Sequence, residues 1–182
     1  MEDNFIKIAI TRSEFFSKEA ALINEILKND MALYVHIRKP FANKEEIKNL
    51  IKEINPEFHC RLKLHDHFEL MEDLALGGIH LNSRNPEPYP EVKSISISCH
   101  SINDVNKMNV YDYFFISPIF DSISKKGYKA AFDLEELSKI IKGKNAIALG
   151  GVTPEKFPLL KKLGFSGAAL LSHFFPDSYI YK

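Results

Sequence analysis

Cysteine and net charge are both scarce in this sequence of 182 residues. Its two cysteines, Cys60 and Cys99, are far apart and match no metal-binding or redox spacing, so we expect a reduced chain in the cytoplasm. The 24 basic residues balance the 24 acidic residues. This balance excludes a global electrostatic field that would recruit nucleic acid or an anionic membrane, so any basic site must be local.

Long apolar runs are missing as well. The longest ones are far too short to span a bilayer, and the acidic residues 1–4 are followed at once by a strand-like run, unlike a signal peptide. What is present is an ordinary globular composition, with 45% hydrophobic and 26% charged residues. We therefore expect one domain over residues 1–182, which is long enough for a single core.

Short apolar runs typical of buried strands recur along the whole chain. They predict eight strands, at residues 6–10, 33–37, 61–64, 79–81, 94–98, 113–116, 146–149 and 168–171. Helix start signals lie between many of these runs, at Ser17, at Asn43 with Glu46, at Ser101 with Asp104, at Asp133 with Glu136, and at Thr153 with Pro154.

Eight strands alternating with helices predict a compact (β/α)8 TIM barrel. An open doubly wound sheet is the alternative, but it needs fewer strands. The proline-rich segment 86–90 leaves only an abbreviated helix after the fourth strand, and too few residues follow the eighth strand for a full helix. A barrel wall that is thin at these two places predicts an apolar patch that a homodimer could cover.

Polar residues at the strand ends are the first candidates for a site, because the strands of such a barrel can all end on one rim. Those after the sixth, seventh and eighth strands are Ser122, Ser124, Lys125, Gly150, Gly151 and Ser172. Hydroxyl groups, a lysine ammonium and backbone amides that approach closely suit a phosphate group. A solvated loop after the sixth strand and a plain glycine turn after the seventh remain the alternatives.

A second group of candidates follows the second and third strands. Arg38 and Lys39 are basic, and Asp66 stands between His65 and His67. Such a mixture suits a magnesium–diphosphate site, which needs one or two carboxylates with basic groups opposite. A helix cap is an equally good interpretation of Asp66.

Two further histidines, His80 and His100, lie in or at the ends of short strands. We interpret them as core or rim residues rather than catalytic ones. No pair of histidines in the chain has the spacing of a helical zinc motif, which argues against zinc.

In their order and spacing, these pieces resemble the thiamine phosphate synthases and their sister group, the thiazole tautomerases, over nearly the whole chain. The matching segments are residues 36–38, 66, 78–81, 98–101, 112–113, 117–120, 122–125, 148–154 and 167–172. No single piece is decisive, but their order and spacing together are specific.

The resemblance implies a cytoplasmic enzyme that joins hydroxymethylpyrimidine diphosphate to thiazole phosphate and releases pyrophosphate with the help of Mg²⁺. It implies that the diphosphate is held by Arg38, Ser98 and Lys125, and that Asp66 is a magnesium ligand. The thiazole phosphate would be held by Gly151 and Ser172, next to Gly150. Ser122 and Ser124 would line the site between the two substrates, and His36 and His65 would face them.

This chain also departs from the synthase pattern. Asn85 stands where synthases carry a second magnesium-binding aspartate, His65 replaces their asparagine, and His36 replaces their glutamine. Synthases carry a lysine two residues past the arginine, and this chain has Pro40 at that position. These changes weaken the metal–diphosphate half of the expected site and leave the thiazole-phosphate half intact.

Two alternatives to a synthase therefore stay open. One is a thiazole phosphate tautomerase, in which His36, His65 or His67 would act as acid or base near neutral pH. The histidine that some tautomerases carry in the sixth-strand motif is Pro118 here, so this pattern is incomplete too. The other alternative is a non-catalytic barrel that binds a phosphorylated ligand.

Overall fold

Eight parallel strands follow one another in sequence order in a closed barrel, so the chain has the expected (β/α)8 fold. The computed structural model describes residues 4–90, 92–121 and 132–176. The strands are β1 (Ile6–Ile10), β2 (Tyr34–Ile37), β3 (Leu62–Leu64), β4 (Gly78–Leu81), β5 (Ile95–Cys99), β6 (Tyr113–Ile116), β7 (Ala146–Ala148) and β8 (Gly167–Leu170). Each lies within one residue of its expected bounds.

Helices connect most of these strands. They are α1 (Glu19–Lys28), α2 (Lys44–Lys52), α3 (Leu70–Asp73), α4 (Ile102–Val105), α5 (Leu134–Ile141) and α6 (Phe157–Leu163), with 3-10 turns η1 (Pro56–Arg61), η2 (Met108–Val110) and η3 (Pro154–Lys156). The described residues between β4 and β5 hold no helix, and neither do those after β8 up to residue 176. Both abbreviated connections were expected. No helix in the described parts of the chain is long and apolar enough to cross a membrane.

Helix starts follow the local sequence signals at most places. At α2 the Asn43 side chain accepts from the Glu46 N–H and the Glu46 carboxylate accepts from the Asn43 N–H, a complete capping box. Asp133 caps α5. The expected cap Ser17 is wrong, because α1 begins at Glu19 after a left-handed Lys18 that makes no side-chain cap.

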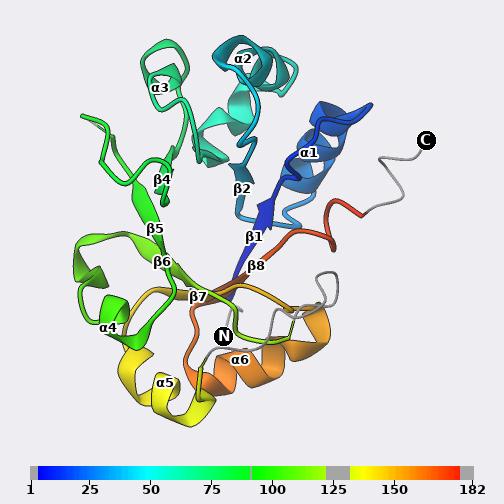
Figure 1. Cartoon of the computed structure of the whole chain (residues 1–182). Helices are drawn as coiled ribbons and strands as arrows, with labels where there is room; N and C mark the ends of the chain where they lie inside the picture. Colours follow the sequence, from blue (N-terminus) through cyan, green and yellow to red (C-terminus); the bar gives the residue numbers. More distant parts are fainter. Residues whose placement is uncertain (1–3, 91, 122–131, 177–182) are drawn as a thin grey trace. The chain divides into compact units, whose positions relative to one another are not determined.

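Contacts within the chain form two compact units. The first unit comprises residues 1–7 and 96–170, and the second comprises residues 8–95 and 171–182. The single-domain organisation stays a prediction. In the first unit β6 is buried along its whole length, which explains its run of four aromatic and aliphatic residues. Helices α5 and α6 pack against each other there (Figure 1).

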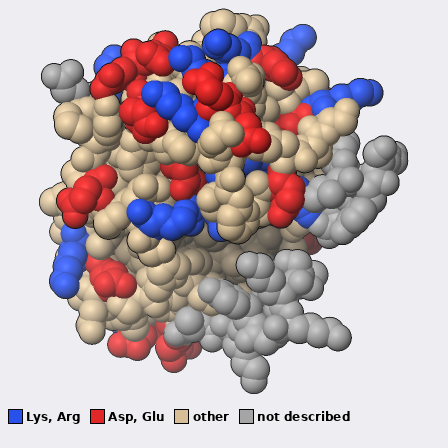
Figure 2. All heavy atoms as spheres, turned by 45° about the horizontal axis from the view of Figure 1, so that its top comes forward, with Lys and Arg blue, Asp and Glu red and all other residues tan. Residues whose placement is uncertain are grey.

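In the second unit, β1 to β4 pair in parallel with a continuous register. The core is built from branched aliphatic side chains, among them Ile8, Ile23, Val35, Ile47 and Leu64, all fully buried. On the face shown in Figure 2, acidic and basic side chains are interspersed, as the balanced composition leads one to expect.

Candidate active site

The second unit brings together one carboxylate and two guanidinium groups beyond the ends of β2, β3 and β4. Arg84 donates to Asp66 from Nε to Oδ1 (3.1 Å) and from Nη2 to both Oδ1 and Oδ2 (3.0 and 3.1 Å). The Asn85 amide donates to the same Oδ1 at 2.9 Å. The half-buried Arg38 interacts electrostatically with both: burial and then the positive charge of Arg84 lower the pKa of Arg38, and the negative charge of Asp66 acts to raise it. We call Arg38, Asp66, Arg84 and Asn85 the charged cluster.

A tight turn after β4 positions Arg84 and Asn85 of the charged cluster. Asn82 and Asn85 exchange backbone hydrogen bonds of 3.1 and 3.0 Å, and the Asn82 side chain accepts from the Arg84 N–H at 3.0 Å. Both asparagine amides donate to the carbonyl of His65, at 2.8 and 3.0 Å. The turn is thus fixed to the end of β3, and Arg84 has a defined place beside Asp66. Sequence reasoning missed Arg84, since nothing in its local sequence marks it as a partner of Asp66.

Lys39 does not belong to this cluster, contrary to the expectation that it would serve a diphosphate. Its side chain is fully buried, and its Nζ donates to both oxygens of Glu19 (2.7 and 2.8 Å) and to the carbonyl of Glu14 (2.7 Å). Burial lowers the pKa of Lys39 and raises that of Glu19, and each partner opposes the shift of the other. The pair is structural.

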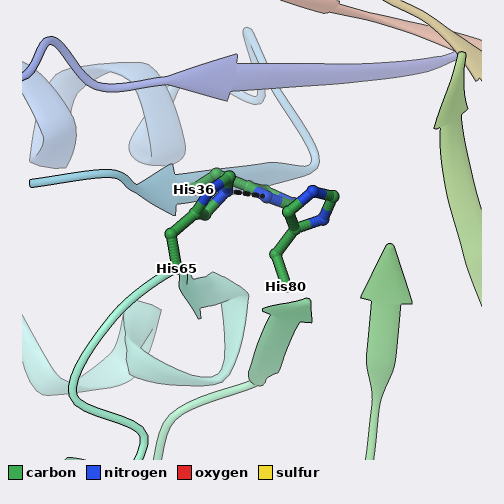
Figure 3. A group of neighbouring side chains, drawn as sticks. All are labelled: His36, His65 and His80. Atoms are coloured by element: carbon green, nitrogen blue, oxygen red, sulfur yellow. Dashed lines mark hydrogen bonds between the residues drawn. The ribbon is translucent and has the colours of Figure 1, made fainter. Parts of the chain in front are cut away.

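Three histidines meet on one face of the second unit's strands. His36 lies on β2 and pairs in register with Lys63 of β3, and Lys63 pairs with Gly78 of β4. Two residues further on, His65 and His80 occupy the same face, because side chains alternate along a strand. Figure 3 shows the rings of His36, His65 and His80 facing one another, with His36 Nδ1 and His65 Nε2 hydrogen-bonded at 2.9 Å. We call these three residues the histidine cluster.

The histidine cluster is closed to solvent. His36 and His80 are fully buried and His65 is 5% exposed. Burial lowers the pKa of His36 and of His65 well below the ordinary value, and the neighbouring His80 adds to both effects. Burial also lowers the pKa of His80 to about 3. The lowered pKa values make all three rings weak bases, so they are neutral at pH 7.

In the first unit, Gly150 and Gly151 follow β7 with positive φ angles of 91° and 61°. A Cβ on Gly151 would lie 2.3 Å from the carbonyl oxygen of Asp121, so only glycine fits this close approach of two backbones. The Lys156 ammonium donates to the Gly151 carbonyl at 2.5 Å and lies 4.1 Å from the centroid of the Phe120 ring. Lys156 is a basic group beside the expected phosphate position, and the sequence reasoning did not select it.

The remaining expected site residues differ in how far the structure locates them. Ser98 lies half-buried on β5, paired in register with Phe115. Ser172 follows β8 in the second unit and is exposed. Ser122, Ser124 and Lys125 lie outside the described residues. The roles of all these residues stay predictions.

Comparison with known proteins assigns the chain. The family model described as "Thiamine monophosphate synthase" matches residues 8–174. The chain belongs to the thiamine monophosphate synthase family.

Individual relatives agree with this assignment. A solved structure from Bacteroides thetaiotaomicron, described as thiamine phosphate pyrophosphorylase, is 36% identical with a TM-score of 0.79, covering 92% of this chain and 83% of its own. The thiamine-phosphate synthase of Bacteroides fragilis is 25% identical over 158 residues, which cover 75% of this chain and 76% of that protein. A thiamine phosphate pyrophosphorylase from Pyrococcus furiosus, 19% identical with a TM-score of 0.74 over 98% of this chain and 91% of its own, shares the fold.

Thiamine phosphate synthases generally depend on Mg²⁺. Asp66 and Asn85, the expected ligands, would have to offer oxygen atoms to this ion. Asp66 and Asn85 do lie together, but both carboxylate oxygens of Asp66 are engaged by Arg84 and the Asn85 amide nitrogen faces the same carboxylate. Mg²⁺ prefers free oxygen ligands in an octahedral arrangement. The residues present therefore do not form a ready magnesium site. Asp66 is not a helix cap either, because the N-cap of α3 is Glu69, without a side-chain bond.

Proposed function

We propose that this protein is a thiamine phosphate synthase, which joins hydroxymethylpyrimidine diphosphate to thiazole phosphate and releases pyrophosphate. The observation that carries this proposal is the family match over residues 8–174. The charged cluster in the second unit supports it. The proposed setting is the cytoplasm, and the proposed partners are the two small phosphorylated substrates. Association into a homodimer is a separate proposal.

In this proposal the diphosphate is bound by Arg38 and Arg84. A guanidinium group presents a rigid fork of N–H donors that matches phosphate oxygens, and two such groups offset much of the diphosphate charge. The developing charge on the leaving pyrophosphate is then stabilised by groups already in place, which is where an enzyme of this kind gains rate. Asp66 positions Arg84 rather than binding the substrate itself.

Residues of the first unit suit the other phosphate. Gly150 and Gly151 carry no side chains, and the chain packs closely against them, because a Cβ on either would lie within 3.0 Å of Pro118, Phe120 or Asp121. The following turn η3 begins at Pro154. Lys156 adds an ammonium group next to Gly151. We assign the thiazole phosphate to these residues together with Ser172. As the family resemblance implies, Ser122 and Ser124 line the site between the two substrates, and Ser98 and Lys125 also hold the diphosphate.

The tautomerase alternative loses support from the chemistry of the histidines. His36 and His65 have pKa values lowered by burial, so they would accept a proton poorly near pH 7. His67 Nε2 lies 3.0 Å from the carbonyl oxygen of Ala42. Because a carbonyl can only accept, this nitrogen donates its proton to it and is not available as a base. No specific observation favours proton transfer at this site over pyrophosphate release.

An assay with both purified substrates tests the proposal directly. Thiamine phosphate and pyrophosphate should form in equal amounts, and omission of either substrate should abolish both. If thiazole phosphate alone is converted to an isomer, the protein is a tautomerase. If both substrates bind but nothing forms, the non-catalytic alternative holds.

The same assay at several Mg²⁺ concentrations addresses the metal. We propose that the altered site responds to Mg²⁺ less steeply than one with two free carboxylates. Asn85→Asp places a second carboxylate against Asp66 and should raise the apparent Mg²⁺ affinity about 10-fold, because two adjacent carboxylates favour a bound dication. Asn85→Ala is the control, since it removes the same amide without adding charge. Equal Mg²⁺ dependence in all three proteins would reject a metal role at this position.

A further inference from the structure

The histidine cluster has the composition of a transition-metal site. Among the described residues, the three side chains place one ligand nitrogen each within 4.8 Å of the other two. They come from three neighbouring strand positions, one on β2, one just past β3 and one on β4 (Figure 3). Ligands held by a sheet are positioned better than ligands on loops.

The distances are close to those a metal ion needs. Zn²⁺ binds imidazole nitrogen at about 2.0–2.1 Å, so a tetrahedral ion spaces its ligand atoms about 3.4 Å apart. His36 Nδ1 and His65 Nε2 are 2.9 Å apart, slightly closer than this spacing. The rings of His65 and His80 are stacked, with centroids 4.3 Å apart and planes at 23°. An ion would therefore require one of these two rings to turn about its Cβ–Cγ bond, so that its lone pair lies toward the common centre.

The electronic state of the rings also suits a metal. A histidine must be neutral to bind a metal ion, and burial keeps all three rings neutral. Three imidazoles in one place bring three nitrogen lone pairs into the interior of the unit. In the metal-free state at least one pair of these nitrogens shares a single proton, in the bond between His36 and His65.

We propose that His36, His65 and His80 bind a divalent transition-metal ion of the Zn²⁺ type, with water or a small anion as the fourth ligand. Imidazole suits Zn²⁺, Co²⁺ and Ni²⁺, whereas Mg²⁺ prefers oxygen, so this site is distinct from any magnesium site at Asp66. The helical spacing rule for zinc could not reveal it, because the three ligands come from separate strands. The inference rests on the geometry of the three rings and not on the proposed synthase reaction.

The surroundings determine what the fourth ligand can be. Lys63 acts on His36, while Arg38 and Arg84 act on His65, all with positive charge. Three neutral ligands leave the full charge of the ion uncompensated. The ion would accordingly favour an anionic fourth ligand, such as hydroxide, over a neutral one.

Titration of the metal-free, untagged protein with Co²⁺ tests this proposal. A Cys60→Ser background removes the exposed thiol as a competing ligand. One equivalent of Co²⁺ should bind and give the intense visible absorption of a four-coordinate ion. Zn²⁺ should displace it, and it should also raise the melting temperature, since a ligand bound only by the folded state stabilises that state.

Two substitutions distinguish Co²⁺ binding at the histidine cluster from adventitious binding elsewhere. His36→Gln and His65→Asn introduce the side chains that the family resemblance gives at these positions, so both variants should fold. Each should weaken Co²⁺ binding by more than about 100-fold, beyond the loss expected for a residue outside the ligand shell. The exposed His100→Ala should bind like the parent.

The proposal fails if the parent binds no stoichiometric Co²⁺ or gives only the weak spectrum of a six-coordinate surface ion. It also fails if His36→Gln and His65→Asn bind as tightly as the parent. Circular dichroism in chelator verifies that the variants are folded. If a variant does not fold, the spectrum and stoichiometry of the parent decide the question alone.

Discussion

Arg84 is the residue on which the proposed chemistry depends most. It is 39% exposed, while its partner Asp66 is 11% exposed at the side chain, so Arg84 can reach a ligand without losing its orienting contact. Charged hydrogen bonds to phosphate are worth about 1.5–3 kcal/mol. We expect Arg84→Ala to raise the KM for the pyrimidine diphosphate by about 10- to 100-fold, at about 1.4 kcal/mol for each factor of ten.

Arg84→Lys is the matched control, because it keeps the charge but loses the two-pronged contact with Asp66. It should fall between the parent and Arg84→Ala in KM for the diphosphate. The KM for thiazole phosphate should stay unchanged in both variants. If Arg84→Ala leaves both kcat and the KM for the diphosphate unchanged, Arg84 lies outside the diphosphate site.

Single residues also show what the sequence could not reveal. Arg38 and Asp66 were selected because each follows a strand end, and a strand end is visible in a sequence. Arg84 and the histidine cluster became visible only through contacts between strands far apart in the chain. Lys39 was misread for the same reason, since its sequence position beside Arg38 gives no sign of the buried Glu19.

The buried pair of Lys39 and Glu19 ties the end of β2 to the start of α1, and its stability is testable at the level of these elements. Removing one partner leaves an unpaired buried charge, at a cost of about 3–5 kcal/mol. We expect Glu19→Ala to lower the free energy of unfolding in denaturant by this amount. The double variant Glu19→Leu with Lys39→Met should recover most of it.

An exposed pair in the same unit provides the control. Lys48 and Asp73 are also 2.7 Å apart, but Asp73 is 47% exposed and water screens the interaction. Asp73→Ala should therefore lower the free energy of unfolding far less than Glu19→Ala does. Equal losses in Asp73→Ala and Glu19→Ala would show that burial does not decide the value of these pairs.

The turn after β7 allows a second test at this scale. Gly151 and Gly143 both have positive φ, 61° and 76°, but a Cβ on Gly151 meets the Asp121 carbonyl while a Cβ on Gly143 meets nothing within 4 Å. Gly143→Ala should cost about 1 kcal/mol from the backbone conformation alone. Gly151→Ala should cost about 1–3 kcal/mol more, because the two backbones must separate, and it should weaken phosphate binding. Thermal melts and phosphate titration of the two variants provide the comparison.

Elements were the most predictable level of the structure. All eight strands appear close to their expected bounds, since an apolar run bounded by turn residues depends on local sequence alone. The predicted cap of α1 at Ser17 was wrong. The helix begins two residues later, at Glu19, whose carboxylate forms the buried pair with Lys39. Local signals hold where no tertiary contact competes with them.

For the whole molecule, the histidine cluster predicts a dependence of stability on pH. In metal-free protein, the unfolded chain protonates these histidines below about pH 6.5, whereas the folded chain keeps them neutral down to lower pH, to about 3 for His80. The unfolded state thus binds more protons in this window, and the free energy of unfolding falls as the pH falls. Each histidine contributes up to about 1.4 kcal/mol per pH unit well below pH 6.5, about half of that at pH 6.5, and almost nothing above about pH 7.5.

Denaturant unfolding in chelator between about pH 7.5 and pH 5 measures this slope, in a window above the range in which most carboxylates titrate. The double variant His36→Gln with His65→Asn lacks two of the titrating groups, so its stability should fall less steeply than that of the parent below about pH 7, and the two slopes should converge toward pH 7.5. Added Zn²⁺ should stabilise the parent most at the upper end of the window, because protons and the metal compete for the same nitrogens. Parallel curves for the parent and the double variant would mean that the rings are protonated in the folded protein, and neither their neutrality nor their burial could then be as described.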